Sequence, residues 1–317
     1  MSEPTVVIYD PITTLRWNYD TEREALAARG VRLVVPGDLT ESRAALGTAD
    51  LVVTSGRLPD EDLERMTKAC AILCYSVGMD GVNAARAAEL GITVANVPDY
   101  CTDEVSDQGI ALLMAVQRLI VPTAAAAAQG QWEVRDWDEF YRIRRVPGQT
   151  CGVVGVGRIG SRFASKAQGL GMTVIGHDPY RQDAPIPLVP LAELLRRSDA
   201  VVLCAALTNG SRHLIDAAAI DLMRDDAILI NVARGGLVDE AALAAALRAG
   251  RLRGAGLDVR EVEPTPPDAD PLLGLRNVVL TQHIGATSVE AFADIRRIAA
   301  ERILALLADN GRLGAGR

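Results

Sequence analysis

The sequence predicts an α/β protein built from two parallel β-sheets. In two separate stretches of the chain, short apolar runs alternate with helical patterns, which is typical of parallel strands covered by helices on both faces. The length of 317 residues is enough for about two domains. Because hydrophobic residues make up 49% of the chain, a disordered protein is excluded.

The N-terminal third of the chain holds the first alternating set. Its apolar runs predict strands at Thr5–Tyr9, Val31–Val35, Leu51–Thr54, Ala71–Cys74 and Thr93–Ala95. Helices are predicted between them at Glu22–Arg29, Ser42–Leu46, Asp60–Lys68 and Val82–Leu90. Gly30 and Gly91 follow helix ends, where a left-handed residue is favoured.

The second alternating set predicts a sheet of its own. Its strands are expected at Cys151–Gly155, Thr173–Gly176, Ala200–Cys204, Ala227–Val232, Gly254–Val259 and Val278–Thr281. Helices between them include Ile159–Leu170, Leu191–Arg196 and Glu240–Ala249. Two long helices, Glu104–Leu119 and Ser288–Asp309, flank the set, and the second should return the chain to the first domain. The predicted domains are therefore 1–98 with 288–317, and 99–287.

Composition narrows the function classes. A net charge of −8, from 33 basic and 41 acidic side chains, argues against nucleic acid as a partner. The sequence shows no apolar run long enough to span a membrane and no signal peptide, so we expect a cytoplasmic protein without a membrane partner. Five cysteines, an odd number, favour buried thiols over a disulfide scaffold. Only three histidines occur, so no metal site is expected.

The segment Gln129–Pro147 concentrates aromatic and charged residues in a chain with few aromatics. It contains Trp132, Trp137, Phe140 and Tyr141 among arginines that include Arg135, Arg142, Arg144 and Arg145. One interpretation is a loop packed on a neighbouring helix or a dimer contact. The other is a wall of an active-site cleft. Its acidic residues, Glu133, Asp136, Asp138 and Glu139, argue against a nucleic-acid patch.

A glycine-rich loop follows the first strand of the second set. The run Gly155-Val156-Gly157-Arg158-Ile159-Gly160 comes after an apolar strand and opens a helix, which is the context that a dinucleotide loop requires. Gly155 permits the tight turn, Gly157 lets the backbone approach a pyrophosphate, and Gly160 allows helix and strand to pack closely. The helix N-terminus offers free N–H groups to the phosphates.

Asp178 is the predicted ligand of the adenosine ribose. It ends the next strand, 18 residues after Gly160, which is near the spacing of about 20 that is expected for this acid. A carboxylate there accepts from the ribose hydroxyls and repels a 2′-phosphate, so NAD is favoured over NADP. Arg181, three residues later, could serve a 2′-phosphate and keeps NADP as the less favoured alternative.

Three charged residues follow three strands of the second set. Arg234, Glu263 and His283 each come just after the carboxyl end of a predicted strand, at the sheet edge where the glycine loop also lies. The cation suits a substrate carboxylate and a keto oxygen, and the imidazole suits proton exchange with that oxygen. The carboxylate would bind the second ring nitrogen and raise the histidine pKa. These groups suit hydride transfer to a 2-oxo acid.

With these residues, the chain resembles the D-2-hydroxyacid dehydrogenases, which include phosphoglycerate dehydrogenase, D-lactate dehydrogenase and the C-terminal-binding-protein corepressors. The resemblance runs from about Leu51 to Asn310 and follows an ordered series of motifs. These are Val77–Asp80, Gly91–Pro98, Asp99–Asp107, Gly155–Gly160, Leu229–Asp239, Gly256–Val259, Glu263-Pro264 and His283–Gly285. The Asp99–Asp107 segment is most similar to the C-terminal-binding-protein branch.

The resemblance implies a flavodoxin-like substrate domain and an NAD-binding Rossmann domain, a cleft between them, and a homodimer made through the cofactor domain. It gives Arg234, Glu263 and His283 the catalytic roles and makes the backbone of Val77 and Gly78 hold the substrate carboxylate. It further implies that Asp258 faces the nicotinamide carboxamide and that Thr208 and Val105 line the nicotinamide half of the site.

Several positions depart from the family pattern. Ser76 replaces a common glycine and Gly81 a common asparagine, beside the loop expected to hold the carboxylate. Arg260 replaces an apolar residue, and Gln282 replaces a proline before the histidine. No tryptophan follows His283, which favours an enzyme over a corepressor.

The function expected from the sequence is an NAD-dependent 2-hydroxyacid dehydrogenase that acts on a small 2-oxo acid or its D-2-hydroxy form. One alternative is a relative with a phosphorylated or phosphonate substrate, because Arg57 matches the substrate-facing loop and would suit a second anionic group, although it could equally be a surface arginine beside Asp60. Arg16 and Trp17 are weaker candidates for the same site. The other alternative is an NAD-sensing corepressor.

Overall fold

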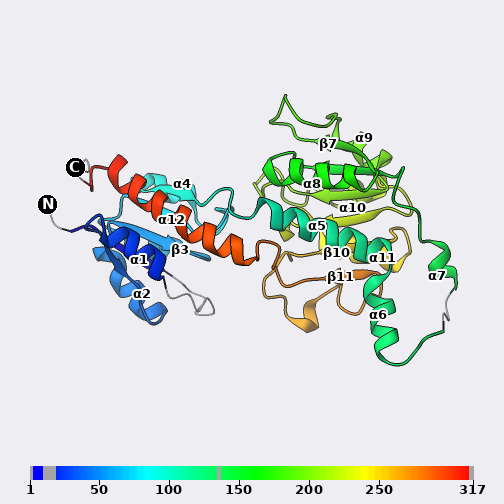
Figure 1. The fold of residues 1–317 in the computed structure, drawn as a ribbon, viewed down its shortest axis with the longest axis horizontal. Coiled ribbons are helices and arrows are strands. Elements are labelled where there is room, and N and C mark those ends of the chain that lie inside the picture. Colours follow the sequence, from blue (N-terminus) through cyan, green and yellow to red (C-terminus); the bar gives the residue numbers. More distant parts are fainter. Residues whose placement is uncertain (1–2, 10–18, 134–136, 314–317) are drawn as a thin grey trace. The chain divides into compact units, whose positions relative to one another are not determined.

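The computed structural model describes residues 3–9, 19–133 and 137–313. Arg16, Trp17, Arg135 and Asp136 therefore lie outside the described residues. The chain divides into two compact units, one of Met1–Tyr100 with Ser288–Arg317 and one of Cys101–Thr287 (Figure 1). Each unit contains one parallel sheet, which confirms the predicted fold class.

The first unit has a five-stranded sheet in the order β2-β1-β3-β4-β5, the flavodoxin-like order. The strands are β1 (Thr5–Tyr9), β2 (Arg32–Val34), β3 (Leu51–Thr54), β4 (Ala71–Cys74) and β5 (Thr93–Asn96). All pairs are parallel, and β1 lies between β2 and β3. Every residue of β1, β3 and β4 is buried, as expected for apolar strands covered on both faces.

Helices cover both faces of this first sheet. They are α1 (Asp20–Ala27), α2 (Leu39–Ala45), α3 (Asp60–Leu63), α4 (Ala84–Glu89) and the long α12 (Val289–Asp309), with a 3₁₀ turn at Leu46–Thr48. Alternate residues of β1 enter different cores. Val6 and Ile8 pack with Leu26 of α1 and Ile303 of α12, whereas Val7 packs on the opposite side.

The second unit has a six-stranded sheet in the order β11-β10-β9-β8-β6-β7. The strands are β6 (Thr150–Val154), β7 (Thr173–His177), β8 (Ala200–Leu203), β9 (Ile228–Asn231), β10 (Gly254–Leu257) and β11 (Val278–Leu280). Strand β6 pairs with β7 on one side and with β8 on the other, so the chain changes direction across the sheet at β6. The carboxyl ends of strands at such a switch point are where open α/β sheets bind ligands.

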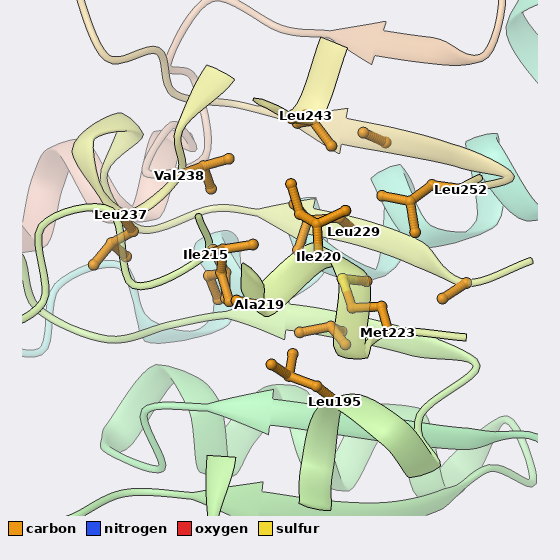
Figure 2. Packing of buried hydrophobic residues seen from close by; sticks show 14 of the residues in the cluster. Leu195, Ile215, Ala219, Ile220, Met223, Leu229, Leu237, Val238, Leu243 and Leu252 are labelled. Carbon is orange, nitrogen blue, oxygen red and sulfur yellow. The ribbon is translucent and has the colours of Figure 1, made fainter. Parts of the chain in front are cut away.

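Helices and short turns surround the second sheet. They are α5 (Thr102–Gln117), α6 (Ile120–Ala128), α7 (Trp137–Tyr141), α8 (Arg158–Gly169), α9 (Leu191–Arg197), α10 (Ala217–Leu222) and α11 (Glu240–Arg248), with 3₁₀ turns at Gly235–Leu237 and Pro267–Ala269. The core beneath α10 and α11 is formed by aliphatic side chains such as Ile220, Leu229 and Leu243 (Figure 2). A side chain at Gly109 of α5 would lie 2.9 Å from Phe163 of α8, so this glycine allows the two helices to approach closely.

Two local predictions need correction. The helix expected over Asp60–Lys68 ends at Leu63, because the next amides form short turns: Met66 donates to Leu63 and Thr67 donates to Arg65. The segment Gln129–Pro147 contains the short helix α7, which was not expected. The left-handed conformations predicted at Gly30 and Gly91 are confirmed, with φ of +67° and +74°.

Two further predictions concern the state of the cysteines and the presence of a membrane-spanning helix. All five cysteines are free; four are buried and Cys204 is half-buried, as predicted. No single helix in the described ranges is long and apolar enough to cross a membrane, although α5 and α6, bent by 67° at their break, meet that length and composition test together. Helix α5 packs on α8 and on strands β9 and β10 of its own unit.

Candidate active site

The glycine loop occupies the switch point of the second sheet. Gly155 follows β6 with φ of +86°, and a side chain there would lie 2.5 Å from the backbone of Ala205, just after β8. A side chain at Gly160 would lie 2.0 Å from the carbonyl oxygen of Gly155, so helix α8 can begin this close to the strand only with glycine. Above Gly157 the space is open, with no atom within 4 Å of an added Cβ.

This arrangement fits a pyrophosphate. The loop exposes Gly157 and Arg158 and leads into α8, whose first backbone N–H groups have no intrahelical acceptors. An anion over Gly157 would therefore meet N–H donors and the positive end of a helix dipole. These are the properties that the sequence predicted for the phosphate half of a dinucleotide site.

Asp178 lies at the same loop. Its carboxylate accepts the N–H of Val156 at 3.0 Å through Oδ2 and the N–H of Tyr180 at 3.0 Å through Oδ1. The guanidinium of Arg181 contacts the carbonyl of Val156 and donates to Ser161 at 3.2 Å. The acid predicted to bind ribose and the cation considered for a 2′-phosphate thus both contact the glycine loop.

The two positions expected to line the nicotinamide half differ in exposure. Thr208 lies in the exposed turn after β8, where its N–H donates to Ser211 at 2.7 Å. Val105 is buried in the first turns of α5, the helix that packs on α8.

His283 and Glu263 form a hydrogen-bonded pair. The Nδ1 atom of His283 lies 2.7 Å from Oε2 of Glu263, and both side chains are partly exposed. The bond to Glu263 raises the pKa of His283 above its usual value, against the opposing effects of burial and of the charge on Arg234. Burial acts to raise the pKa of Glu263, but its hydrogen bonds with His283 and the backbone of Arg260 outweigh that effect and lower it. The predicted carboxylate–imidazole bond and the direction of the histidine shift are confirmed.

Asp258 holds the backbone around His283 in place. Its side chain is buried, and it accepts from Thr281 Oγ1 at 2.6 Å and from the backbone N–H groups of Ile284 and Gly285 at 3.1 and 2.8 Å. The N–H of His283 donates to the Asp258 carbonyl at 2.8 Å. This buried residue therefore fixes the backbone of His283, which has a left-handed φ of +54°.

Arg234 begins the turn after β9. Its Nη1 donates to the carbonyl of Ala233 at 2.7 Å, and Asn231 holds the turn by donating to the Arg234 carbonyl at 2.9 Å. A side chain at the next residue, Gly235, would lie 1.8 Å from the carbonyl carbon of Arg260. The turns that carry Arg234 and Arg260 are thus packed backbone against backbone. Arg234 also contributes to the electrostatics of both Glu263 and His283.

In the first unit, the loop after β4 presents backbone N–H groups. Its carbonyls are occupied: Ser76 accepts from the Val97 N–H at 3.1 Å, Val77 from Asn96 at 2.8 Å, and Gly78 from the Ser76 hydroxyl at 2.7 Å. Among the described residues, the N–H groups of Val77 and Gly78 have no hydrogen-bond acceptor. A loop with satisfied carbonyls and available amides is suited to bind a carboxylate.

Arg57 borders a cavity of about 440 Å³ in the first unit, lined also by Leu58, Pro59, Asp60, Asp80, Gly81, Val82 and Asn83. The arginine is exposed and forms no ion pair or hydrogen bond with the described part of the chain. Asp60 lines the same cavity and accepts from Asn83 at 2.9 Å, so Arg57 is a surface arginine beside Asp60 without an ion pair to it, and its role toward a substrate stays a prediction. Two of the departures from the family pattern lie nearby: Ser76 is in the loop after β4, and Gly81 is on the wall of this cavity.

Sequence reasoning missed three parts of the site. It did not predict that Asp258 holds the backbone around His283 or that Gln108 and Thr281 donate to Asp258. It also did not predict the ion pairs of Arg260. Gln108 donates to Thr281 at 3.0 Å from the middle of α5, where no local motif marks it. For Arg260 a signal existed, because a charged residue replaces an apolar one in a run that otherwise matches the family. The expected contact of Asp258 with the nicotinamide carboxamide stays a prediction.

Comparison with known proteins agrees with this site. The sequence profile of the D-isomer specific 2-hydroxyacid dehydrogenase NAD-binding domain matches residues 110–285. A glyoxylate reductase from Korarchaeum cryptofilum is 39% identical over 251 residues, which cover 77% of this chain and 75% of that protein. Among solved structures, a D-lactate dehydrogenase from Aquifex aeolicus in complex with NAD and lactic acid has a TM-score of 0.84 and 25% identity, with 99% of both chains covered.

A further solved structure contains NADP in place of NAD. An NADPH-dependent glyoxylate/hydroxypyruvate reductase from Sinorhizobium meliloti, in complex with NADP and malonate, has a TM-score of 0.81 and 27% identity, covering 97% of this chain and 94% of that one. The profile match covers more than half of the present chain. The matched part includes the glycine loop, Arg234, Glu263 and His283. The chain belongs to the D-isomer specific 2-hydroxyacid dehydrogenase family and is an NAD-dependent oxidoreductase that acts on CH–OH groups.

Proposed function

We propose that this protein interconverts a small 2-oxo acid and its D-2-hydroxy acid, with Arg234, Glu263 and His283 as its catalytic residues. The observation that carries the proposal is the 2.7 Å bond between His283 and Glu263 in the same unit as the glycine loop. When bound, the nicotinamide supplies or accepts the hydride that is exchanged with the substrate carbon. The residues of the chain then have to bind the acid, polarise its carbonyl and move one proton.

The proton is assigned to His283. In reduction, the protonated imidazole donates from its Nε2 atom to the carbonyl oxygen, because Nδ1 is engaged by Glu263. In oxidation, the neutral imidazole takes the proton back from the hydroxyl group. Glu263 stabilises the charged imidazole and fixes the tautomer of the neutral one. Arg234 binds the substrate carboxylate and polarises the keto oxygen with its positive charge.

The amides of Val77 and Gly78 are assigned to the substrate carboxylate. Their carbonyls are tied inside the loop, and their N–H groups have no acceptor among the described residues. The unit of Met1–Tyr100 with Ser288–Arg317 therefore acts as the substrate domain, and the unit of Cys101–Thr287 acts as the cofactor domain.

The glycine loop and the residues around it are assigned to NAD. Gly155, Gly157, Arg158, Ile159 and Gly160 form the pyrophosphate cradle, supported by the open space over Gly157. The negative charge of Asp178 at this loop supports NAD over NADP, since it would repel a 2′-phosphate. Thr208, Val105 and Asp258 are assigned to the nicotinamide end of the site.

A second candidate substrate class is favoured by Arg57. This exposed cation has no partner in the described part of the chain and borders the cavity of the first unit. A 2-oxo acid with a second anionic group, either a phosphate, a phosphonate or a carboxylate, would give it a charge-assisted partner.

The test is turnover with a panel of 2-oxo acids and NADH, using His283→Ala as the inactive control. The wild type should reduce at least one small 2-oxo acid, and the variant should lose about 10²–10⁴-fold in kcat because its proton donor is gone. NADH binding should be retained in the variant, since the glycine loop and Asp178 are unchanged. Binding of NADH without turnover of any acid would contradict the proposal and favour the corepressor alternative.

We also infer a homodimer made through the cofactor domain. Five large hydrophobic side chains are exposed around α6 and α7, and these are Ile120, Val121, Trp132, Trp137 and Tyr141. An exposed apolar group of this kind is typical of a protein–protein interface. Light scattering should give the mass of a dimer, and Ile120→Lys with Val121→Lys should give a monomer. The control Val289→Lys, at a still more exposed apolar position in the other unit, should remain a dimer.

The cysteines support a cytoplasmic location. All five are free thiols, and a reducing compartment is where such a set persists. Recovery of the native protein in the periplasmic or secreted fraction of its host would contradict this assignment.

A further inference from the structure

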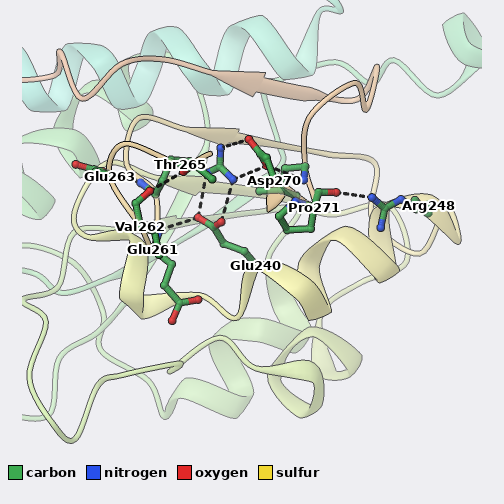
Figure 3. A network of polar contacts seen from close by, with 10 residues as sticks. Glu240, Arg248, Glu261, Val262, Glu263, Thr265, Asp270 and Pro271 are labelled. Atoms are coloured by element: carbon green, nitrogen blue, oxygen red, sulfur yellow. Dashed lines mark hydrogen bonds and ion pairs between the residues drawn. The ribbon is translucent and has the colours of Figure 1, made fainter. Parts of the chain in front are cut away.

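Arg260 forms a largely buried network with two carboxylates beside the active site. Its Nε and Nη2 atoms bind Glu240 at 3.0 and 2.9 Å, and its Nη1 and Nη2 atoms bind Asp270 at 2.7 Å each (Figure 3). The exposed fraction of the side chain is 11% for Arg260, 8% for Glu240 and 7% for Asp270. The guanidinium thus holds two carboxylates, each through two contacts, which is a geometry that fixes its orientation.

The backbone of the same residue contacts Glu263. The N–H of Arg260 donates to Oε1 of Glu263 at 2.7 Å, while Oε2 of Glu263 binds His283 at 2.7 Å. The next N–H, that of Glu261, donates to Glu240 at 2.8 Å, so Glu240 holds both the side chain of Arg260 and the chain that follows it. On the other side, Gly235 packs against the Arg260 carbonyl. The main chain at Arg260 is therefore held between Glu240 and the turn of Arg234.

We propose that Arg260 is a positioning residue, whose ion pairs with Glu240 and Asp270 hold the Glu263 carboxylate in place for its bond with His283. The proposal rests on the proposed function, since it assumes the roles of Glu263 and His283 given there. One oxygen of Glu263 is fixed by the backbone N–H of Arg260, and that N–H is fixed in turn by the contacts of the Arg260 side chain with Glu240 and Asp270. An apolar side chain at this position could fill the space but could not hold the two carboxylates.

A purely stabilising role makes a different prediction. If the network only stabilised the fold, its loss would lower the melting temperature and leave the chemistry of the folded enzyme unchanged. If it positions Glu263, its loss also changes the protonation of His283 below the melting transition. The charged groups that act on His283 are Glu263, Arg234 and Asp258, and the Arg260 variants below leave all three in the chain.

Two variants separate these roles. Arg260→Lys keeps a positive charge between Glu240 and Asp270 but cannot make both paired contacts. The triple variant Arg260→Met, Glu240→Gln, Asp270→Asn removes the whole charge set, so that no buried carboxylate is left unpaired and the chain can fold. Arg248→Met is the matched control, because Arg248 is an exposed arginine that donates to the Pro271 carbonyl next to Asp270.

The measurement is kcat for reduction against pH with the full-length enzyme, together with the Kd for NADH. We expect both Arg260 variants to lose activity at a lower pH than the wild type, by on the order of half a pH unit, because a less well-held Glu263 raises the histidine pKa less. Arg248→Met should match the wild type, and the Kd for NADH should be unchanged in all. If either Arg260 variant gives a profile superimposable on that of the wild type, the positioning role is wrong.

A parallel profile of Glu263→Gln distinguishes this failure from failure of the proposed function. If Glu263→Gln shifts the profile and the Arg260 variants do not, only the positioning role is overturned. If Glu263→Gln also leaves the profile unchanged, the assignment of Glu263 itself has failed.

Discussion

The imidazole of His283 and the carboxylate of Glu263 lie 2.7 Å apart, from Nδ1 to Oε2. The backbone of His283 is fixed independently, because its N–H donates to Asp258 and the following two N–H groups bind the Asp258 carboxylate. The hydrogen bond with Glu263 raises the histidine pKa, so a larger fraction of the enzyme carries the proton near neutral pH. A proton donor for carbonyl reduction needs this property.

Replacing Asp178 with alanine should relax the choice of cofactor. The carboxylate at the glycine loop is assigned to the ribose hydroxyls, and its loss should cost NAD about 1–3 kcal/mol of binding free energy. NADP should lose less, because a negative charge near its 2′-phosphate is removed. The measurement is kcat/KM with each cofactor in the wild type and Asp178→Ala. An unchanged ratio of the two efficiencies would remove Asp178 from the ribose site.

Two glycines of the loop should respond differently to alanine. At Gly157 an added Cβ meets no atom within 4 Å, so Gly157→Ala should fold normally but weaken NADH binding by tenfold or more, which is about 1.4 kcal/mol. At Gly160 the added Cβ would lie 2.0 Å from the Gly155 carbonyl, so Gly160→Ala should lower the free energy of unfolding by about 1–3 kcal/mol. Thermal unfolding and NADH titration of both variants check this pair. Normal NADH affinity in Gly157→Ala would contradict a pyrophosphate above that residue.

Arg57 should matter only for substrates with a second anionic group. Arg57→Ala should raise KM for a dicarboxylic or phosphorylated 2-oxo acid by roughly tenfold, the loss of a charge-assisted contact. KM for glyoxylate or pyruvate should change little, because these acids have one carboxylate and it is assigned to Val77, Gly78 and Arg234. Equal increases for both kinds of substrate would point to a structural role and remove the argument for a dianionic substrate.

The sequence predicted those features that follow from local patterns. Strands such as Leu51–Thr54 and Ala71–Cys74 are continuous apolar runs bounded by turn residues, and they occur where expected. The residues after the strands could be assigned to one sheet edge because parallel strands place their carboxyl ends together. For this reason His283 and Glu263 could be paired in advance although they are 20 residues apart.

Features that depend on tertiary contacts were not predictable in this way. Leu63 and Met66 are both buried at helical spacing, yet the helix ends at Leu63, because spacing does not distinguish a helix from successive short turns. Gln108 contacts Thr281, which lies far along the chain on another element, and no local pattern links them. Arg260 was visible as a departure from the family, but its partners Glu240 and Asp270 became apparent only when three segments were brought together.

The pH dependence of kcat for wild type and Glu263→Gln tests the central claim most directly, namely that Glu263 sets the protonation of His283. The pKa of His283 is raised by Glu263, so reduction should proceed below that pKa and decline as the pH rises through it. Glutamine can still bond to the ring but carries no charge. The histidine pKa should therefore fall, and reduction by the variant should decline at a pH lower by about one unit. Oxidation, which needs the neutral imidazole, should begin at a correspondingly lower pH. Superimposable profiles of the two enzymes would contradict the claim.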